Sequence, residues 1–396
     1  MISKNMSRLA GGNSAIRAMF EEGNRLAAQY GRENVYDFSL GNPNFPAPEA
    51  VKTAALDILN TVDPISLHGY MSNSGYPEVR EAIAGSLNRR FGTDFGARNI
   101  IMTVGAAGGL NVILKTILDP GDEVLTFAPY FLEYGNYVAN FGGVLKAVPA
   151  NTETFQPNLT ELERMLGEKT KAVIINTPNN PTGVVYSAET ITALSDILRA
   201  KQTELGHEIY IISDEPYREL AYGGVEVPYV TKFYDNTFIG YSWSKSLSLP
   251  GERIGYIVIP DAMADFQQTF DAACIANRVL GFVNAPSLQQ RVVARCLEEK
   301  TDLSGYDANR RALYDGLTER GFECVFPQGA FYLWMKTPVD DREFVNEAKK
   351  YNILVVPGSS FACPGYVRIA YCVAHSTILR SMDGFAKLAE KYGLRK

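Results

Sequence analysis

The chain has 396 residues, of which 46% are apolar and 21% are charged, and its formal net charge is −6. This composition is typical of a soluble globular protein with about two to three domains, and the absence of a basic block argues against nucleic acid as a partner. The five cysteines form no C-x-x-C pair, so neither a disulfide framework nor a zinc site is expected.

No targeting or membrane segment is expected either. The first residues, MISKNMSRLAGGNSAIR, lack the apolar stretch that a signal peptide carries. The longest apolar run begins at Ile100 and is interrupted by Asn111, Lys115 and several glycines, so it does not predict a membrane span. We therefore expect a cytoplasmic protein with reduced thiols.

Most of the chain alternates between helix-like and strand-like segments. One predicted helix begins at Pro77, which suits a first helical turn, and another begins after Ser187, a residue that caps helices well. Short apolar segments rich in β-branched and aromatic residues predict strands. These segments begin at Val124, Ala172, Ile209, Thr237 and Gly255. The alternation predicts an α/β fold with a mostly parallel sheet, which binds ligands beyond the carboxyl ends of its strands.

The last part of the chain has a different pattern. Strands are expected within 329–336, 353–358 and 366–372, with a helical stretch at 340–350. This pattern predicts a smaller α+β domain against which the helical N-terminal stretch packs. The expected limits are 1–45 for the N-terminal segment, 46–285 for the large domain and 286–396 for the small domain.

One lysine is surrounded by residues suited to carbonyl chemistry beside a phosphate. Lys245 lies in YSWSKSLSLPGERIGY, directly after a predicted strand. The hydroxyls of Ser242 and Ser244 and the guanidinium of Arg253 can bind phosphate oxygens. Partial burial and a neighbouring cation lower a lysine pKa, so that the amine becomes nucleophilic. A solvated surface lysine is the alternative, and the apolar strand before Lys245 argues against it.

The segment SWSKSLSLPGERIGY resembles the cofactor-lysine motif of the class I/II aminotransferases, the fold-type-I pyridoxal-phosphate enzymes. The resemblance extends from Ile16 to about Tyr371. It implies a large domain with a mostly parallel, seven-stranded-type sheet flanked by helices, and a smaller domain built from N- and C-terminal segments. It also implies that Lys245 carries pyridoxal 5'-phosphate as a Schiff base. No metal is expected.

Two polar motifs at predicted strand ends match the family's contacts to the cofactor ring. In SDEPYREL the resemblance assigns Asp214 to the ring nitrogen and Tyr217 to the ring oxygen, whereas Glu215 is not chosen. An isolated Asp at this place would otherwise be a helix cap. In NTPNNPTG the resemblance assigns Asn180 to the ring oxygen and the substrate side of the site. A rigid turn is the alternative.

Other motifs match the family's phosphate and stacking contacts. VGAAGGL resembles the phosphate cup, which implies backbone contacts from Gly105, Ala106 and Ala107, although small residues also allow close packing. APYFLEY implies that Phe131 stacks on the ring; Tyr130 is the second choice and core packing the alternative.

The resemblance also assigns contacts to the substrate and to a second subunit. Gly41, in SLGNPNFPAP, brings backbone close to the substrate carboxylate. Arg368 is a lone cation in the apolar strand YVRIAYC and needs an anion, which the family supplies as the substrate α-carboxylate; a structural ion pair is the alternative. Tyr70 reaches the phosphate of the neighbouring subunit, which implies a homodimer with shared active sites.

These assignments predict a transaminase of amino-acid metabolism that moves an amino group between an L-amino acid and a 2-oxo acid such as 2-oxoglutarate. Lys245 moves the α-proton, and Asp214 supports the electron-accepting ring. The alternative is a lyase that eliminates from the β-carbon of cysteine conjugates, because fold and cofactor do not fix the outcome. A ligand-sensing module and a dehydrogenase fit less well, since neither a winged helix nor a G-x-G-x-x-G after an early strand is apparent.

The preferred substrate is left open between aspartate, alanine and aromatic amino acids. Ala107 lacks the Lys that some dicarboxylate-specific relatives carry at that position. Arg278 is a candidate to reach an acidic side chain from the partner subunit, and a solvated Arg is the alternative. The three histidines show no ligand spacing.

Overall fold

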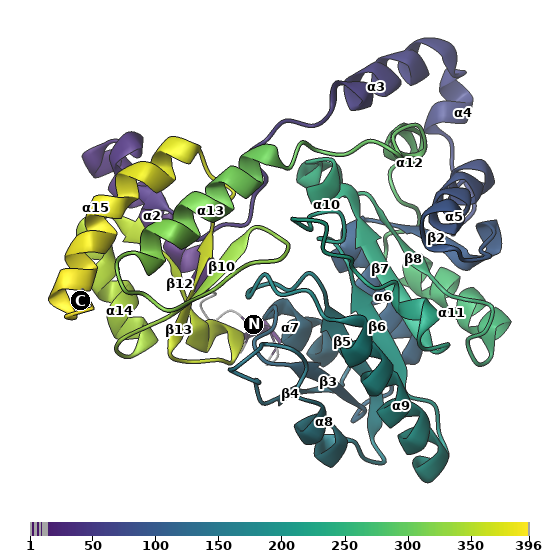
Figure 1. The fold of residues 1–396 in the computed structure, drawn as a ribbon. Coiled ribbons are helices and arrows are strands. Elements are labelled where there is room, and N and C mark those ends of the chain that lie inside the picture. The colour runs from purple at the N-terminus through teal and green to yellow at the C-terminus, as the bar shows by residue number, and fades with distance from the viewer. Residues whose placement is uncertain (1, 4–5, 8, 10–14, 395–396) are drawn as a thin grey trace.

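The structure is a computed structural model that describes residues 2–3, 6–7, 9 and 15–394. Two sheet-containing bodies lie next to each other, and a segment with α3 (Glu49–Thr61) and α4 (Pro64–His68) extends away from the smaller one (Figure 1). Among the described residues, no helix has the length and apolar character needed to cross a bilayer.

The larger body is built on a seven-stranded sheet with the order β2-β8-β7-β6-β5-β3-β4. Its strands are β2 (Ile100–Thr103), β3 (Glu123–Phe127), β4 (Val144–Val148), β5 (Thr170–Asn176), β6 (Tyr210–Asp214), β7 (Thr237–Ser242) and β8 (Gly255–Val258). Strand β8 runs antiparallel to β2 and β7, and the other neighbouring strands are parallel. The expected mostly parallel sheet of the seven-stranded type is therefore confirmed.

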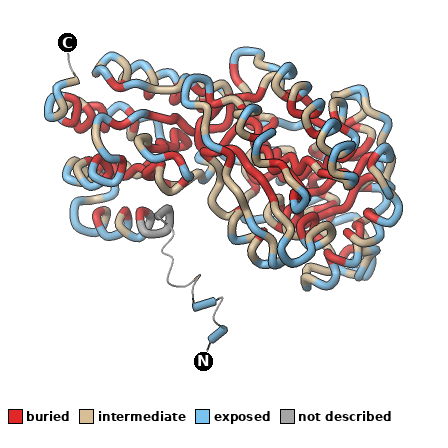
Figure 2. The backbone as a smooth tube through the Cα atoms, turned by 90° about the horizontal axis from the view of Figure 1, so that it is seen from below, coloured by how far each residue is buried: buried red, intermediate tan, exposed pale blue. Residues whose placement is uncertain are grey.

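Helices cover both faces of this sheet, because successive side chains of each strand point to opposite sides. Ile100 and Met102 join one apolar layer with helices α3, α5, α8, α9 and α12, whereas Ile101 joins another with α6, α7 and α11. Figure 2 shows buried segments in the interior of the molecule, with most of the exposed residues around them. The remaining helices of this body are α5 (Pro77–Phe91), α6 (Gly105–Ile117), α7 (Glu133–Asn140), α8 (Leu159–Met165), α9 (Ala188–Leu205), α10 (Trp243–Ser246), α11 (Phe266–Val279) and α12 (Ser287–Ala294).

Local sequence explains where two of these helices begin and end. Pro77 is the first residue of α5, and Ser187 caps α9 by accepting a hydrogen bond from the backbone N–H of Thr190 at 3.1 Å. Both helices end at a glycine with left-handed backbone, Gly92 and Gly206, a conformation that an L side chain disfavours. Both predicted helix starts are confirmed.

The smaller body has an antiparallel sheet with the order β12-β13-β10-β9 and a short parallel pair of β1 and β11. Its strands are β1 (Tyr36–Asp37), β9 (Cys324–Val325), β10 (Tyr332–Lys336), β11 (Ile353–Leu354), β12 (Val356–Pro357) and β13 (Tyr366–Ala370). Its helices are α2 (Ala15–Tyr30), α13 (Ser304–Thr318), α14 (Asp341–Ala348) and α15 (His375–Lys391). Short 3-10 helices lie at Arg32–Asn34, Lys349–Tyr351 and Gly358–Phe361 in this body, and at Ala97–Asn99, Val230–Lys232 and Pro250–Glu252 in the larger one.

The N-terminal segment packs against this smaller body. The backbone N–H of Phe38 donates to Leu354 O, and Phe38 O accepts from Ala370 N–H, each at 2.9 Å. Of the expected segment 1–45, residues 1, 4–5, 8 and 10–14 lie outside the described residues. The domain limits stay predictions, and α12, just beyond the expected limit at 286, packs on α3 and α5 of the larger body.

One local prediction needs correction. The strand expected within 353–358 divides into β11 and β12, because Leu354 pairs with Asp37 whereas Val356 pairs with Arg368 of the other sheet. The small residues after Val104 lie at the junction of a strand and a helix. Strand β2 ends at Thr103 and α6 begins at Gly105, so these residues form the first turn of the helix.

Candidate active site

A cavity of about 310 Å³ opens where several strands of the large sheet end. The carboxyl ends of β2, β5, β6 and β7 lie at one edge of the sheet, and antiparallel β8 begins there. Twelve of the residues predicted from sequence line this cavity: Gly41, Ala106, Ala107, Phe131, Asn180, Asp214, Tyr217, Ser242, Ser244, Lys245, Arg253 and Arg368. Parallel strands thus bring together residues that are far apart in the sequence.

Lys245 lies on the short helix α10, directly after β7. Its Nζ donates a hydrogen bond to the backbone oxygen of Gly41 at 2.7 Å. Burial lowers the pKa of Lys245 to about 8, and the positive charges of Arg368 and Arg253 act in the same direction. A substantial fraction of the amine is therefore neutral near physiological pH, as nucleophilic attack requires.

Asp214 ends β6 and is 5% exposed at the wall of the cavity. Its Oδ2 accepts a hydrogen bond from the Tyr134 hydroxyl at 2.6 Å, whereas its Oδ1 is buried and has no hydrogen-bond partner. Burial raises the pKa of Asp214 to about 7, although the Tyr134 hydrogen bond opposes this shift. A buried acceptor without a partner is costly, so Oδ1 is available to a donor that enters the cavity.

The two asparagines of the NTPNNPTG segment connect this acid to the opposite wall. The Asn176 side chain donates to the backbone oxygen of Asp214 and accepts from the Asn180 backbone N–H, each at 2.7 Å. The Asn180 Oδ1 accepts a hydrogen bond from Arg368 at 3.0 Å. Asn180 is therefore fixed by its neighbours, while its Nδ2 makes no hydrogen bond to any described residue.

Arg368 is a buried cation without an acidic partner among the described residues. Its side chain is 2% exposed, and its Nη atoms donate to Asn180 Oδ1 and to the backbone oxygen of Ser39 at 2.6 Å. Its Nε is buried and makes no hydrogen bond. The guanidinium lies 4.5 Å from the ring centroid of Tyr332 and 4.9 Å from that of Phe361. These neighbours leave the positive charge uncompensated, so an anion is needed.

Another part of the cavity lining presents donors suited to a phosphate. Helix α6 begins at Gly105, so its first backbone N–H groups have no partner within the helix and Ala106 and Ala107 line the cavity. Gly105 itself does not line it. A side chain at Gly105 would place its Cβ 2.7 Å from Arg253 Nη2, and the backbone there has a φ of +75°. Glycine at this position therefore lets Arg253 approach the helix start.

Phe131 lines the cavity, whereas Tyr130 does not. The ring of Phe131 packs edge-on against Tyr134, at 5.7 Å between centroids. Tyr70 does not line this cavity within its own chain and is 96% exposed. Arg278 is also exposed and away from the cavity. The roles predicted for these four residues stay predictions.

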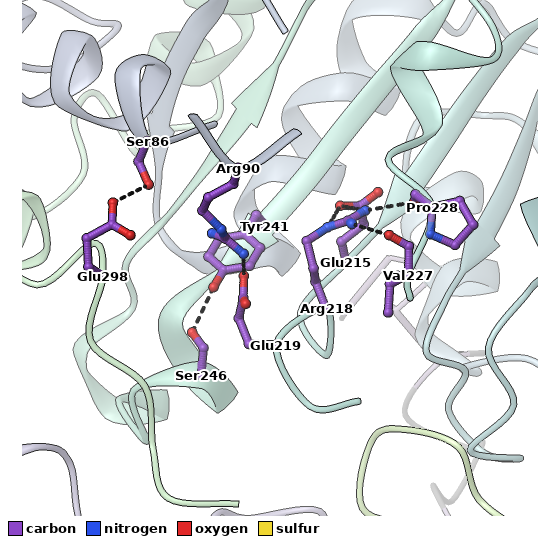
Figure 3. Close-up of polar contacts among 10 residues, drawn as sticks. All are labelled: Ser86, Arg90, Glu215, Arg218, Glu219, Val227, Pro228, Tyr241, Ser246 and Glu298. Carbon is purple, nitrogen blue, oxygen red and sulfur yellow. Dashed lines mark hydrogen bonds and ion pairs between the residues drawn. The ribbon is translucent and has the colours of Figure 1, made fainter. Parts of the chain in front are cut away.

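Glu215 has a different environment from its neighbour Asp214, and Figure 3 shows the Glu215 side chain next to that of Arg218. It is fully buried, forms an ion pair with Arg218, and accepts a hydrogen bond from Ser213 at 2.7 Å. Arg218 also donates to the backbone oxygens of Val227 and Pro228. Glu215 is thus satisfied by protein groups and does not line the cavity, whereas Asp214 does.

Sequence reasoning missed several residues of the cavity. Tyr134 holds Asp214, and the Tyr332 hydroxyl lies 2.9 Å from that of Tyr217. Leu110, Tyr137, Asn176, Pro216 and Pro250 complete the lining. Tyr134 and Asn176 belong to segments that the sequence singled out, whereas Tyr332 lies on β10 of the other body. Among the described residues, no group of three or more metal-ligating side chains is present.

Comparisons with known proteins agree with the geometry of this site. The family model for aminotransferase class I and II matches residues 33–383. A probable aspartate/prephenate aminotransferase of Thermus aquaticus is 34% identical over 360 residues, covering 88% of this chain and 90% of that protein. The crystal structure of an amino transferase from Eubacterium rectale is 47% identical, with a TM-score of 0.97 over 99% of both chains. Aspartate aminotransferase from Thermus thermophilus with maleate is 29% identical, with a TM-score of 0.87 over 98% of this chain and 100% of that one.

These relatives carry the names of transaminases, so the lyase alternative is not favoured. The match spans nearly the whole chain, in sequence and in fold. The chain therefore belongs to the class I and II aminotransferases and is a transaminase.

Proposed function

We propose that this transaminase binds pyridoxal 5'-phosphate in the cavity, attached through Lys245, and transfers amino groups between aspartate and 2-oxoglutarate. The observation that carries the proposal is the buried, unpartnered Oδ1 of Asp214 at the wall of the cavity that Lys245 also lines. A protonated pyridine nitrogen is a donor that satisfies such an oxygen.

The chain offers a partner for each polar part of that cofactor. Asp214 is suited to hold the ring nitrogen, and Tyr217 and Asn180 to hold the ring oxygen. The start of α6, with the side chains of Ser242, Ser244 and Arg253, is suited to hold the phosphate. Phe131 is suited to pack on the ring.

When bound, pyridoxal phosphate supplies an aldehyde for covalent attachment and a ring that accepts electrons. Lys245 Nζ would contribute the nucleophilic amine, and the free amine would take the α-proton of the amino acid and deliver it to the exocyclic carbon of the cofactor. Asp214 would stay negatively charged next to a protonated ring nitrogen, because a neighbouring positive charge would oppose the rise that burial causes in its pKa. Arg368 binds the α-carboxylate, which supplies the missing anion.

We propose a homodimer in which each chain supplies Tyr70 to its partner's site. The loop that carries Tyr70 is held against the end of α11, since Asn284 donates to Ser72 O at 2.7 Å and Asn277 donates to Asn73 O at 3.0 Å. Tyr70 is almost fully exposed in the single chain, and the large apolar side chains of Ile65, Ile275 and Val279 are exposed as well. Exposed apolar side chains of this kind are typical of surfaces that pack against another subunit.

Aspartate is proposed on two grounds. The relatives from Thermus aquaticus and Thermus thermophilus are named for aspartate, and the second was solved with maleate, a dicarboxylate. The cations that line the cavity within this chain are Lys245, Arg253 and Arg368, so a distal carboxylate needs one more. Arg278 is exposed next to Asn277, which holds the Tyr70 loop. If Tyr70 reaches the partner's cavity, Arg278 is on the same surface and is brought toward that cavity too.

The test is covalent trapping. The purified chain is incubated with pyridoxal phosphate, reduced with borohydride and mapped by peptide mass spectrometry. We expect an adduct on the peptide that contains Lys245, none in Lys245→Ala, and an unchanged adduct in the control Lys52→Ala, an exposed lysine on α3. Because the neutral amine is the nucleophile, the rate of uptake should rise with pH through about 8. An adduct at another lysine, with Lys245 unmodified, would falsify the proposal.

The reaction is then assayed with a panel of amino acids. This assay uses enzyme that has bound pyridoxal phosphate and has not been treated with borohydride. With 2-oxoglutarate present it should produce glutamate, and aspartate should be the best amino donor. Formation of ammonia and pyruvate from cysteine conjugates without any oxo acid would instead indicate the lyase reaction.

A further inference from the structure

The hydroxyl groups of Tyr217 and Tyr332 meet at the wall of the cavity. Tyr217 follows β6 in the larger body and Tyr332 begins β10 in the smaller one. Their oxygens are 2.9 Å apart, and the residues are 5% and 2% exposed. The contact therefore joins the two bodies through a hydrogen bond that is shielded from water.

Tyr332 also touches two other parts of the proposed site. A Cβ atom at Gly41 would lie 1.8 Å from the Tyr332 hydroxyl oxygen, so this hydroxyl packs directly on Gly41. The backbone oxygen of Gly41 accepts the hydrogen bond of Lys245 Nζ. The Tyr332 ring also contacts Arg368, whose guanidinium lies 4.5 Å from the ring centroid. The pairing of β10 with β13 supports this arrangement. Trp334 lies opposite Arg368, and Tyr332, two residues earlier on β10, points to the same face of the sheet.

The number of protons in the pair restricts how it works. A phenol has one proton and can donate one hydrogen bond, although its oxygen can also accept. If Tyr217 donated to Tyr332, the Tyr217 proton would not be available to an acceptor in the cavity. If Tyr332 donates to Tyr217, the Tyr217 proton is free to point into the cavity. Within the described residues, Tyr332 makes no hydrogen bond to any group other than Tyr217.

Both phenols keep their protons at neutral pH. Burial raises the pKa of Tyr332 to about 12 and holds the pKa of Tyr217 well above its ordinary value. A hydroxyl that accepts a hydrogen bond also becomes a better donor, because chains of hydrogen bonds polarise one another.

We propose that Tyr332 is a positioning residue for this transaminase: its hydroxyl donates to Tyr217 and directs the Tyr217 proton into the cavity, and its ring holds the Arg368 guanidinium in place. This inference rests on the proposed function, in which Tyr217 donates to the ring oxygen of pyridoxal phosphate. It gives one residue of the smaller body two roles, one toward the cofactor through Tyr217 and one toward the substrate carboxylate through Arg368.

The hydroxyl is tested with Tyr332→Phe, which keeps the ring. The dissociation constant of pyridoxal phosphate is measured on the cofactor-free chain by fluorescence quenching, and the visible absorbance of the bound cofactor is titrated with pH. Losing one hydrogen bond should raise the dissociation constant about fivefold. The pH midpoint of the absorbance should rise, because a donor to the ring oxygen favours its negatively charged form. The Michaelis constant for the amino acid should change less than twofold, roughly, since the ring stays over Arg368.

A double-mutant cycle shows whether Tyr332 acts through Tyr217. Tyr217→Phe should weaken cofactor binding at least as much as Tyr332→Phe, and adding Tyr332→Phe to it should change nothing further. The matched control is Tyr371→Phe. Tyr371 is a buried tyrosine that does not line the cavity, and its hydroxyl donates to Ala330 O at 3.1 Å. This control should leave the dissociation constant and the absorbance midpoint unchanged.

The ring is tested with Tyr332→Leu. Loss of the aromatic contact should raise the Michaelis constant for the amino acid about fivefold above that of Tyr332→Phe. Additive effects in the cycle, or an unchanged absorbance midpoint in Tyr332→Phe, would overturn the inference for the hydroxyl, and equal Michaelis constants for the Phe and Leu variants would overturn it for the ring. If the wild-type chain itself fails to take up the cofactor at Lys245, the proposed function fails instead, so the two failures are distinguishable.

Discussion

Asp214 is expected to destabilise the cofactor-free protein at neutral and high pH, and its replacement by Asn should relieve this cost. The carboxyl is buried, and its pKa is raised from 3.8 to about 7. A raised acid pKa means that the folded state binds the proton more tightly than the unfolded state. Stability therefore falls as pH rises from about 4 through about 7, and then levels off.

The size of the effect follows from the same shift. The difference between 3.8 and about 7 corresponds to about 4 kcal/mol at high pH, as an upper limit. Between about pH 5.5 and about pH 8.5 the contribution of Asp214 changes by about 2 kcal/mol. In Asp214→Asn the amide oxygen can still accept the Tyr134 hydrogen bond, but the amide does not titrate.

The assay is urea unfolding of the cofactor-free chain at these two pH values. We expect the Asn variant to gain about 2 kcal/mol relative to wild type on going from the lower to the higher pH. The exposed Asp94, changed to Asn, is the control and should show no such gain. The same Asp214→Asn variant should bind pyridoxal phosphate more weakly, because the ring nitrogen loses its anionic partner. A stability difference that is equal at both pH values would refute the raised pKa and the reasoning built on it.

Two further predictions concern substrate recognition. Arg368→Lys should raise the Michaelis constant of the amino acid about 10- to 100-fold, because an ammonium cannot hold a carboxylate through two parallel hydrogen bonds. The affinity for the cofactor should stay within about twofold of wild type. Steady-state kinetics with cofactor titration check this, and Arg253→Lys, at the phosphate end, should show the reverse pattern; matching patterns in both variants would contradict the assigned ends. Arg278→Ala should lower kcat/KM for aspartate about tenfold and leave alanine nearly unchanged, because only a distal carboxylate gains from that charge. Equal losses for both amino acids, measured in parallel assays, would remove Arg278 from substrate recognition.

Much of the large sheet and the identity of the residues around its ligand edge could be predicted from sequence. The segments that start at Val124, Ala172, Thr237 and Gly255 are strands because short runs of apolar, β-branched and aromatic residues suit a sheet covered on both faces. Lys245 follows such a segment directly, so the parallel topology by itself brings it to the edge where the other strands end.

The contacts that orient those side chains could not be predicted in this way. The partners Tyr134 and Asp214 are 80 residues apart, Tyr217 and Tyr332 are 115 apart, and Arg368 and Ser39 are 329 apart. No pattern along the chain marks such pairs, since each is an ordinary aromatic, polar or charged residue in its own segment.

The sequence by itself determined most of the strands of the large sheet and the starts of α5 and α9, because these depend on short-range periodicity and turn chemistry. Only the tertiary structure decided that Asp214 Oδ1 and Arg368 Nε are buried without partners at one cavity. The physical reason is that desolvation and hydrogen-bond satisfaction depend on every group that surrounds an atom, and those groups come together only when the two bodies pack.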